Sequence, residues 1–453
     1  MTSKRPAFRL ALAGDAIVNR RISTCNDPRV LEIFALFQQS DLGFINCETL
    51  FHDYSGPELY PAAESGWTYM RAPPEVADDL RWMGIKLMSV ANNHTLDYSY
   101  GGLFSTLAAL KKAGIENAGA GRNLEEARAA AYVDTGTARV SLVSMTTSFT
   151  RWSRAGSPYD GIPGRPGINP LGFHFAADKD TLARFIEMAA QFGWWVARVS
   201  DKEWQINPPG LHTTITRYFE TDEKGATMVL DEDDVTANLR AIRNAKAHSD
   251  IAIAHIHNHE WDQLQATTTV PPAFMPPFAR SAVEAGADVV IAQGSHAPLR
   301  GIEIHKGKPI FYDTGDFFAM SNMVTRFPAD FYRRHSSHLT KPMHDMTVAE
   351  VLNVRVPYLR DFPVHPPKPE TPRRRCGVVP VLHYGDDGQL SRIELHPFVH
   401  EHDRVALNGI PMAPADEASA RYVIDHLAEL SRPFGTRIKF DGKIGLLDLS
   451  ASS

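Results

Sequence analysis

The chain has 453 residues, of which 43% are hydrophobic and 22% are charged, and its formal net charge is −6. This composition is typical of a folded globular protein, and it excludes a disordered, a collagen-like or a small disulfide-rich chain. The length predicts two or three domains, or one large domain with insertions. The acidic balance argues against nucleic acid as the main partner, because phosphate binding needs a basic face.

The three cysteines, Cys25, Cys47 and Cys376, are far apart and form no Cys-x-x-Cys pair. A reducing compartment explains this usage, so we expect a cytoplasmic location. The apolar run near the N-terminus is short and is interrupted by Asp15, which makes it a poor signal-peptide core. No stretch approaches the roughly 18 apolar residues of a membrane span, so we expect no integral membrane segment.

Strands and helices are expected to alternate in the first 150 residues. Short apolar runs predict strands at 8–13, 42–45, 86–90 and 139–144. Amphipathic spacing predicts helices at 28–39, 74–83 and 101–113, with Asp27 as the N-cap of the first one. This rhythm is typical of an α/β layered sheet.

The middle of the chain interrupts this pattern. Residues 151–180 are rich in Gly, Pro, Ser and Arg, and a loop of this length is often functional. Residues 178–250 are expected to form an insertion with helices. The acidic run 231–234 is interpreted as the N-terminus of a helix over 235–247 rather than as a metal site, because acidic residues favour the first turn of a helix.

The α/β pattern returns at residue 250. Strands are expected at 251–256, 288–292 and 308–312, and a helix at 273–285. The Pro- and Arg-rich residues 361–375 are predicted to be a surface connection, 377–384 and 390–396 a hairpin, and 416–431 a final helix. We therefore expect an interrupted core at 1–150 and 248–320, an insertion at 151–247 that faces the substrate with a loop and helices, and a C-terminal extension at 321–453 that packs on the core.

Polar residues collect at the C-terminal ends of six predicted strands. They are Asp15; Asn46 and Glu48; Asn92, Asn93, His94 and Asp97; His255, His257, Asn258, His259 and Glu260; Gln293 and His296; Asp313 and Asp316. In open α/β sheets this edge forms the ligand crevice. Carboxylate and amide oxygens with neutral imidazoles suit Mn, Fe, Zn, Mg or Ca, so the pattern predicts a catalytic divalent metal site.

Six of these residues are the candidate metal ligands: Asp15, Glu48, Asn93, His257, His259 and His296. His94, Asp97 and His296 are the candidate catalytic residues, with His94 supplying a base or an anion contact. The alternation of a strand places residues 255, 257 and 259 on one face. The histidines at 305, 335, 338, 383, 396 and 400 are expected to be ordinary surface or core residues.

Seven motifs, in this order, resemble the CapA-type family, which is named for poly-γ-glutamate capsule biosynthesis and belongs to the calcineurin-like metallophosphatase superfamily. They are Gly14-Asp15, Asn46-Cys47-Glu48, residues 91–97, Gly119-Ala120-Gly121, His257-Asn258-His259-Glu260, Gly294-Ser295-His296 and residues 301–317. The resemblance implies a four-layer α/β/β/α sandwich with a metal centre at the loop edges of its sheets. It also implies that Asp15 is the first metal-binding Asp, that Glu48 is the bridging acid, and that Asn93 and His94 form the Asn-His element.

The chain departs from the family pattern at three places. The last motif has only His296 where two histidines are usual, and no Asp-x-His pair follows Gly14. These two departures weaken the expectation of a full dinuclear centre and of plain phosphatase activity, so one or two ions stay open. The usual Gly-Asn-Phe is Gly315-Asp316-Phe317, which adds a carboxylate.

The resemblance implies a metal-dependent enzyme that acts on a poly-γ-glutamyl or other peptide-like anionic substrate by hydrolysis or acid–base chemistry. Arg151, Arg154 and Arg165 could receive its carboxylates, because the guanidinium fork matches a carboxylate. Three alternatives stay open. They are a metal-dependent epimerase of a ribosomal, lasso-type peptide with His94 and His296 as opposed bases, a metallophosphoesterase, and a non-catalytic binding protein. The oligomeric state is not predicted.

Overall fold

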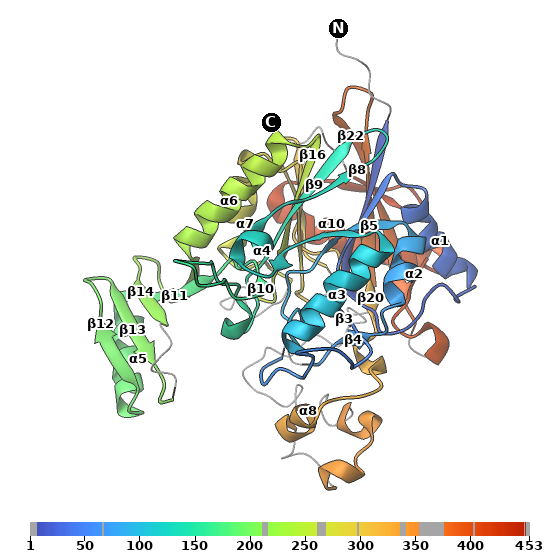
Figure 1. The fold of residues 1–453 in the computed structure, drawn as a ribbon. Helices are drawn as coiled ribbons and strands as arrows, with labels where there is room; N and C mark the ends of the chain where they lie inside the picture. Colours follow the sequence, from blue (N-terminus) through green and yellow to red (C-terminus); the bar gives the residue numbers. More distant parts are fainter. Residues whose placement is uncertain are drawn as a thin grey trace.

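The computed structural model describes residues 7–65, 68–210, 216–260, 269–296, 299–335, 341–352, 376–401, 404–447 and 449. Two β-sheets lie face to face at its centre, and helices cover the outer face of each sheet (Figure 1). The four-layer α/β/β/α sandwich predicted from the sequence is therefore confirmed.

The first sheet combines parallel strands from the N-terminal part with antiparallel strands from the C-terminal part. Its order is β24 (Ile438–Phe440), β25 (Gly445–Leu447), β22 (Leu390–His400), β21 (Cys376–Tyr384), β1 (Phe8–Ile17), β2 (Leu42–Asn46), β5 (Ile85–Ser89) and β6 (Glu116–Ala118). The helices α1 (Pro28–Gln38), α2 (Val76–Met83) and α3 (Ser99–Ala113) cover its outer face. Asp27 caps α1 by accepting a hydrogen bond from the Arg29 N–H, as expected.

The second sheet has the order β18 (Ile302–His305), β19 (Lys308–Phe311), β17 (Val289–Gln293), β16 (Ile251–His257), β9 (Arg139–Thr146) and β8 (Ala131–Asp134). The helices α6 (Glu232–Ala247) and α7 (Met275–Glu284) pack on its outer face. Strands β9, β16, β17 and β19 are parallel, so their C-terminal ends meet at one edge.

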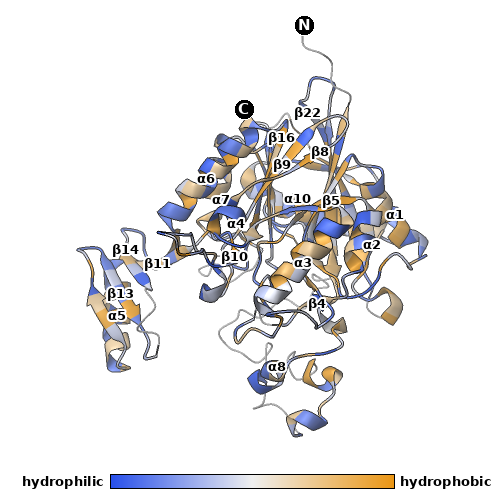
Figure 2. Ribbon diagram, in the orientation of Figure 1, coloured by the Kyte–Doolittle hydropathy of each residue, from blue (hydrophilic) through white to orange (hydrophobic). Residues whose placement is uncertain are grey.

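Hydrophobic burial joins the layers. Leu10 and Phe44 of the first sheet and Leu142, Ile253 and Ile291 of the second form one buried cluster between the two sheets. Figure 2 shows hydrophobic colouring along the central strands and both colours on α6, whose buried face includes Ile242 and Ala245. Each fully buried aliphatic or Phe side chain contributes about 1.5–3 kcal/mol to folding, so this cluster fixes the two sheets against each other.

The insertion contains a sheet that the sequence pattern did not reveal. Its order is β12 (Trp195–Arg198), β13 (Glu203–Asn207), β14 (Arg217–Glu220), β11 (Phe173–Ala177) and β15 (Ala226–Leu230), and α5 (Lys179–Gln191) packs against it. This unit projects from the core at the left of Figure 1. The expectation of a loop and helices missed these strands, because each has only four or five residues and most are half-exposed.

The acidic run marks the start of α6, as predicted. Asp231 is the N-cap and accepts a hydrogen bond from the Asp234 N–H. This helix packs mainly on β9 and β16 of the core. The boundaries proposed for the insertion remain a prediction.

The C-terminal part completes the first sheet. β21 pairs with β1 and forms the expected hairpin with β22, and α10 (Glu417–Ser431) packs on β22 and β24. The predicted surface connection at 361–375 lies outside the described residues. In the part of the chain that the structure describes, no helix has both the length and the apolar character needed to cross a bilayer.

The remaining elements are short. They are β3 (Leu50–Phe51), β4 (Arg71–Ala72), β7 (Ala120–Gly121), α4 (Leu124–Arg128), β10 (Gly167–Ile168), β20 (Phe318–Ala319), α8 (Ala329–Arg334) and β23 (Pro411–Met412).

Candidate metal centre

The C-terminal ends of strands from both sheets meet at one point. The side-chain N–H of Asn46, at the end of β2, donates to Asp15 Oδ1 over 2.7 Å and lies 3.2 Å from His257 Nδ1 of β16. Asp15 and His257 belong to different sheets and are both buried, so Asn46 links the two halves of the sandwich at this edge. The clustering predicted from the strand ends is therefore present.

Glu48 is the centre of this cluster. Its side chain is 0% exposed, and no N–H or O–H of the described residues donates to either carboxylate oxygen. Four imidazole Nε2 atoms surround its Oε1, at 3.7 Å for His257 and 3.9 Å for His94, His259 and His296. Burial, and then the neighbouring charges of Asp15 and Asp316, raise the pKa of the Glu48 carboxyl well above its usual value.

This donor set fits a divalent cation. Three overlapping groups have ligand atoms within 4.8 Å of one another: Asp15, Glu48 and His257; Glu48, His259 and His296; and Asp15, His296 and Asp316. A buried carboxylate without a hydrogen-bond donor is costly, and a cation offsets both the burial and the repulsion between carboxylates. The residues that the structure brings together thus meet the chemical needs of the expected metal ion.

Two histidines of β16 and its following loop face the cluster together. His257 Nε2 lies 2.9 Å from Asn93 Oδ1 and 3.1 Å from His259 Nε2. Burial, and then the neighbouring imidazole of His257, lower the pKa of His259 well below its usual value. Neutral imidazoles are the form that binds metal ions, so the lowered pKa of His259 favours the state that a metal site requires.

His94 is oriented by a carboxylate. Its Nδ1 lies 2.6 Å from Asp97 Oδ2, which also accepts the Met70 N–H over 2.8 Å. Both side chains are nearly fully buried. Because Nδ1 is engaged in this way, Nε2 is the nitrogen of His94 that faces Glu48.

His296 is also oriented by a carboxylate, which comes from a segment later in the chain. Its Nδ1 lies 2.9 Å from Asp316 Oδ1, and its backbone has a φ of 45°, a region that is unfavourable for residues other than Gly. Gly294 has a φ of 104°, and a Cβ there would lie 2.8 Å from the His257 ring. The Gly-Ser-His motif therefore needs Gly at its first position to let His257 and His296 approach.

A buried arginine supports the segment that carries His257 and His259. Arg300 is 1% exposed and donates to Asn258 Oδ1 over 2.7 Å and to the Glu260 carbonyl over 2.6 Å. The Ser148 hydroxyl donates to the Glu260 carboxylate and accepts the His259 N–H over 2.7 Å. Sequence reasoning placed Asn258 and Glu260 at a strand end, but nothing in the sequence pattern points to Arg300.

The three arginines predicted to bind substrate have other contacts. Arg154 uses both terminal nitrogens to bind the buried carboxylate of Asp234, each over 2.8 Å. Its fork is therefore occupied by a structural ion pair, which argues against the predicted substrate contact. Arg165 Nε donates to the Arg154 carbonyl, and Arg151 lies over the ring of Trp152, with 4.6 Å from Cζ to the ring centroid.

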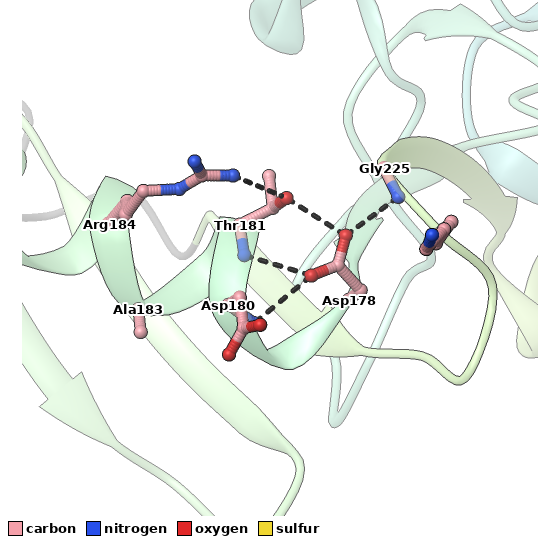
Figure 3. A pocket seen from close by; sticks show the side chains of 7 residues that line it. Asp178, Asp180, Thr181, Ala183, Arg184 and Gly225 are labelled. Atoms are coloured by element: carbon pink, nitrogen blue, oxygen red, sulfur yellow. Dashed lines mark hydrogen bonds between the residues drawn. The ribbon is translucent and has the colours of Figure 1, made fainter.

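A shallow pocket of about 710 Å³ opens in the insertion at the start of α5 (Figure 3). Asp178 lines it, and its carboxylate accepts hydrogen bonds from the N–H groups of Asp180, Thr181 and Gly225. These bonds lower the pKa of Asp178 to about 2. The carboxylate therefore caps α5 and joins it to the β14–β15 loop, and the pocket shares no residue with the candidate metal centre.

Comparison with known proteins shows to which family the chain belongs. Residues 9–321 match the family model described as "Bacterial capsule synthesis protein PGA_cap". The chain belongs to this family. The PGA_cap match includes Asp15, Glu48, His94, His257 and His296, so every strand end of the candidate centre lies within it.

Named relatives agree with this assignment. The uncharacterized protein y4sH of Sinorhizobium fredii is 32% identical over 98% of this chain and 93% of its own length. The "Probable polyglutamine synthesis accessory protein" of Mycobacterium tuberculosis is 29% identical over 54% of this chain and 48% of its own length. The "Capsule biosynthesis protein CapA" of Bacillus anthracis is 22% identical over 55% of this chain and 44% of its own length. The resemblance of the sequence motifs to the CapA-type family is therefore confirmed.

Proposed function

We propose that this PGA_cap protein is a metal-dependent enzyme that acts on a peptide-like anionic polymer of the poly-γ-glutamyl type. The observation that carries the proposal is the buried Glu48 carboxylate, which lies within 3.7–3.9 Å of four imidazole Nε2 atoms and receives no hydrogen bond from the described residues. The names of two relatives, which refer to polyglutamine synthesis and to capsule biosynthesis, support the choice of substrate class.

The residues that would hold the metal are Asp15, Glu48, Asn93, His257, His259 and His296, with Asp316 beside them. One or two ions of Mn, Zn, Fe, Mg or Ca fit this set of oxygen and imidazole ligands. When bound, such an ion polarises a substrate carbonyl and lowers the pKa of bound water. The cytoplasmic location expected from cysteine usage is a further part of this proposal.

His94 is the proposed acid–base residue. Asp97 fixes Nδ1 of His94, so Nε2 is free to take a proton from a reacting group or to return one to it. Asp97 acts through His94 and is therefore a positioning residue. Its carboxylate is itself held in place by the hydrogen bond that it accepts from the Met70 N–H.

A specific observation also favours the epimerase alternative. His94 and His296 each present Nε2 at 3.9 Å from Glu48 Oε1, and each is oriented by a carboxylate on its other nitrogen, from Asp97 and Asp316 respectively. Two such imidazoles can remove and return an α-proton, one acting as base and the other as acid.

Incubation of the metal-loaded chain with a γ-linked oligoglutamate in heavy water tests these functions together. Cleavage detected by mass spectrometry supports hydrolysis, and deuterium incorporation without cleavage supports epimerisation. Activity should be lost in His94→Asn and retained in His305→Asn, a half-buried histidine on β18. Turnover of a phosphodiester that is lost in Asp15→Ala would favour the phosphoesterase alternative. Metal binding without turnover of any of these substrates would favour the alternative of a non-catalytic binding protein.

A further inference from the structure

A strained aromatic residue lies in the loop that follows β3. Tyr54 has a φ of 67°, which is unfavourable for a bulky side chain. Two local contacts hold this conformation: the Tyr54 N–H donates to His52 Nδ1 over 3.2 Å, and Asp53 Oδ1 accepts the N–H of Ser55 over 3.1 Å. Backbone strain of this kind is common at ligand-binding positions, so the Tyr54 loop is a candidate for a binding role.

Two guanidinium groups converge on the Tyr54 ring. The Cζ of Arg71 lies 4.7 Å from the ring centroid, and the Cζ of Arg326 lies 5.8 Å from it. Neither guanidinium group is paired with a carboxylate within 4.0 Å in the part of the chain that the structure describes, although hydrogen bonds from Ser55 and, more weakly, the charge of Arg71 lower the pKa of the exposed Asp53 carboxylate in the same loop. Arg71 donates from Nε to the His52 carbonyl over 2.5 Å, which orients its guanidinium and leaves its terminal nitrogens for another acceptor.

Neighbouring residues connect this pair of arginines to the candidate metal centre. Arg71 follows Met70, whose N–H binds the Asp97 carboxylate that orients His94. Arg326 is two residues after Val324, and Val324 packs in one cluster with Met70 and with Ile17, two residues after Asp15. In Figure 1, β3 and β4 lie at the lower end of the core and α8 lies below them.

A buried polar atom in the same place also lacks a partner. His52 is 0% exposed, and its Nε2 has no hydrogen-bond partner among the described residues. Its ring contacts those of Tyr54 and Tyr98, at 5.2 and 4.3 Å between centroids.

We infer that Arg71 and Arg326, presented by Tyr54, form a subsite for a carboxylate of the substrate whose reacting bond lies at the metal centre. This inference rests on the proposed function and names the recognition group within it. Two forked guanidinium groups suit a carboxylate, whereas the centre formed by Asp15, Glu48 and Asp316 is negative and would repel one. In this proposal Arg71 and Arg326 take the carboxylate-binding role predicted for Arg154, because the Arg154 guanidinium group is engaged by Asp234.

Isothermal titration of the metal-loaded full chain with a γ-linked tetraglutamate tests the subsite without relying on activity. The matched probe is the same peptide with its α-carboxylates converted to amides. We expect the acidic peptide to bind more tightly than the amide, and Arg71→Gln with Arg326→Gln to weaken the acidic peptide by about tenfold or more while leaving the amide unchanged. Arg333→Gln, an exposed arginine of α8, is the control and should have no effect.

Arg71→Lys covers the case in which Arg71→Gln fails to fold, since it keeps the charge and the aliphatic stem; we expect it to bind the acidic peptide with intermediate affinity. Equal binding of acid and amide by the wild type, unchanged affinity in the double variant, or arginine-dependent binding of inorganic phosphate without binding of the acidic peptide would each overturn the subsite. Metal content of the same samples separates the two proposals. A chain that binds no ion contradicts the proposed enzyme, whereas a metal-loaded chain with arginine-independent binding contradicts only the subsite.

Discussion

His94 Nδ1 lies 2.6 Å from Asp97 Oδ2, and this contact directs the other nitrogen of the ring toward Glu48. The two residues are three apart, in the segment that connects β5 to α3, so the short turn alone brings the carboxylate to the imidazole. The proposed acid–base role of His94 depends on this orientation.

Asp97→Asn should lower kcat by about 10²- to 10⁴-fold while metal content stays unchanged, because the amide no longer stabilises the protonated imidazole or fixes its tautomer. Steady-state kinetics, metal analysis and the ¹⁵N chemical shifts of His94 measure the three quantities. Asp78→Asn, at an exposed position in α2, is the control. A change in tautomer without loss of kcat would contradict a positioning role.

Glu48→Gln should abolish stabilisation by divalent ions. In the metal-free protein the same change should leave the free energy of unfolding unchanged or raise it by about 1–3 kcal/mol, because a buried carboxylate without a hydrogen-bond donor is removed. Urea unfolding with and without Mn²⁺ measures both effects, and Glu75→Gln serves as an exposed control. A variant that is less stable than wild type without metal would indicate a structural role for Glu48.

Gly294→Ala should weaken metal binding by at least about tenfold, because the new Cβ would lie 2.8 Å from the ring of His257. Gly307→Ala is a matched control, since that residue also has a positive φ but a Cβ there meets nothing within 4 Å. Gly307→Ala should cost only the backbone penalty of about 1 kcal/mol and keep metal affinity. Equal metal affinity in the two variants would show that Gly294 does not secure the approach of His257.

Asp234→Asn should reduce the free energy of unfolding by about 3–5 kcal/mol, because Asp234 is buried and binds Arg128, Arg154 and the Gly172 N–H. Asp233→Asn, its exposed neighbour in the first turn of α6, should change stability by less than about 0.5 kcal/mol. Denaturant titration of both variants is the measurement. A small loss for Asp234→Asn would restore Arg154 as a residue available to substrate.

The sequence predicted the core because its signals are local and strong. Continuous apolar runs such as 251–256 and the cap at Asp27 correspond to elements with nearly the same bounds. The strand ends also predicted the cluster of Asp15, Glu48 and the histidines, since parallel strands bring their ends to one edge. The binding roles assigned to these residues stay predictions.

Contacts between distant segments could not be predicted in this way. Asp234 binds Arg154, which is 80 residues away in the sequence, and the local sequence around neither residue predicts this ion pair. The same holds for Arg71 and Arg326, which reach one tyrosine ring from two separate segments. The insertion strands were not predicted for a different reason: in short, half-exposed strands the alternation of apolar and polar residues is weak.

Metal analysis of the purified full chain tests the central claim most directly. After incubation with Mn²⁺ or Zn²⁺ and return to metal-free buffer, mass spectrometry of the eluted protein should find one or two divalent ions per wild-type chain and a clear loss in Glu48→Gln. A wild-type chain that retains no ion, or a Glu48→Gln variant that retains as much as wild type, would contradict a metal centre built around Glu48.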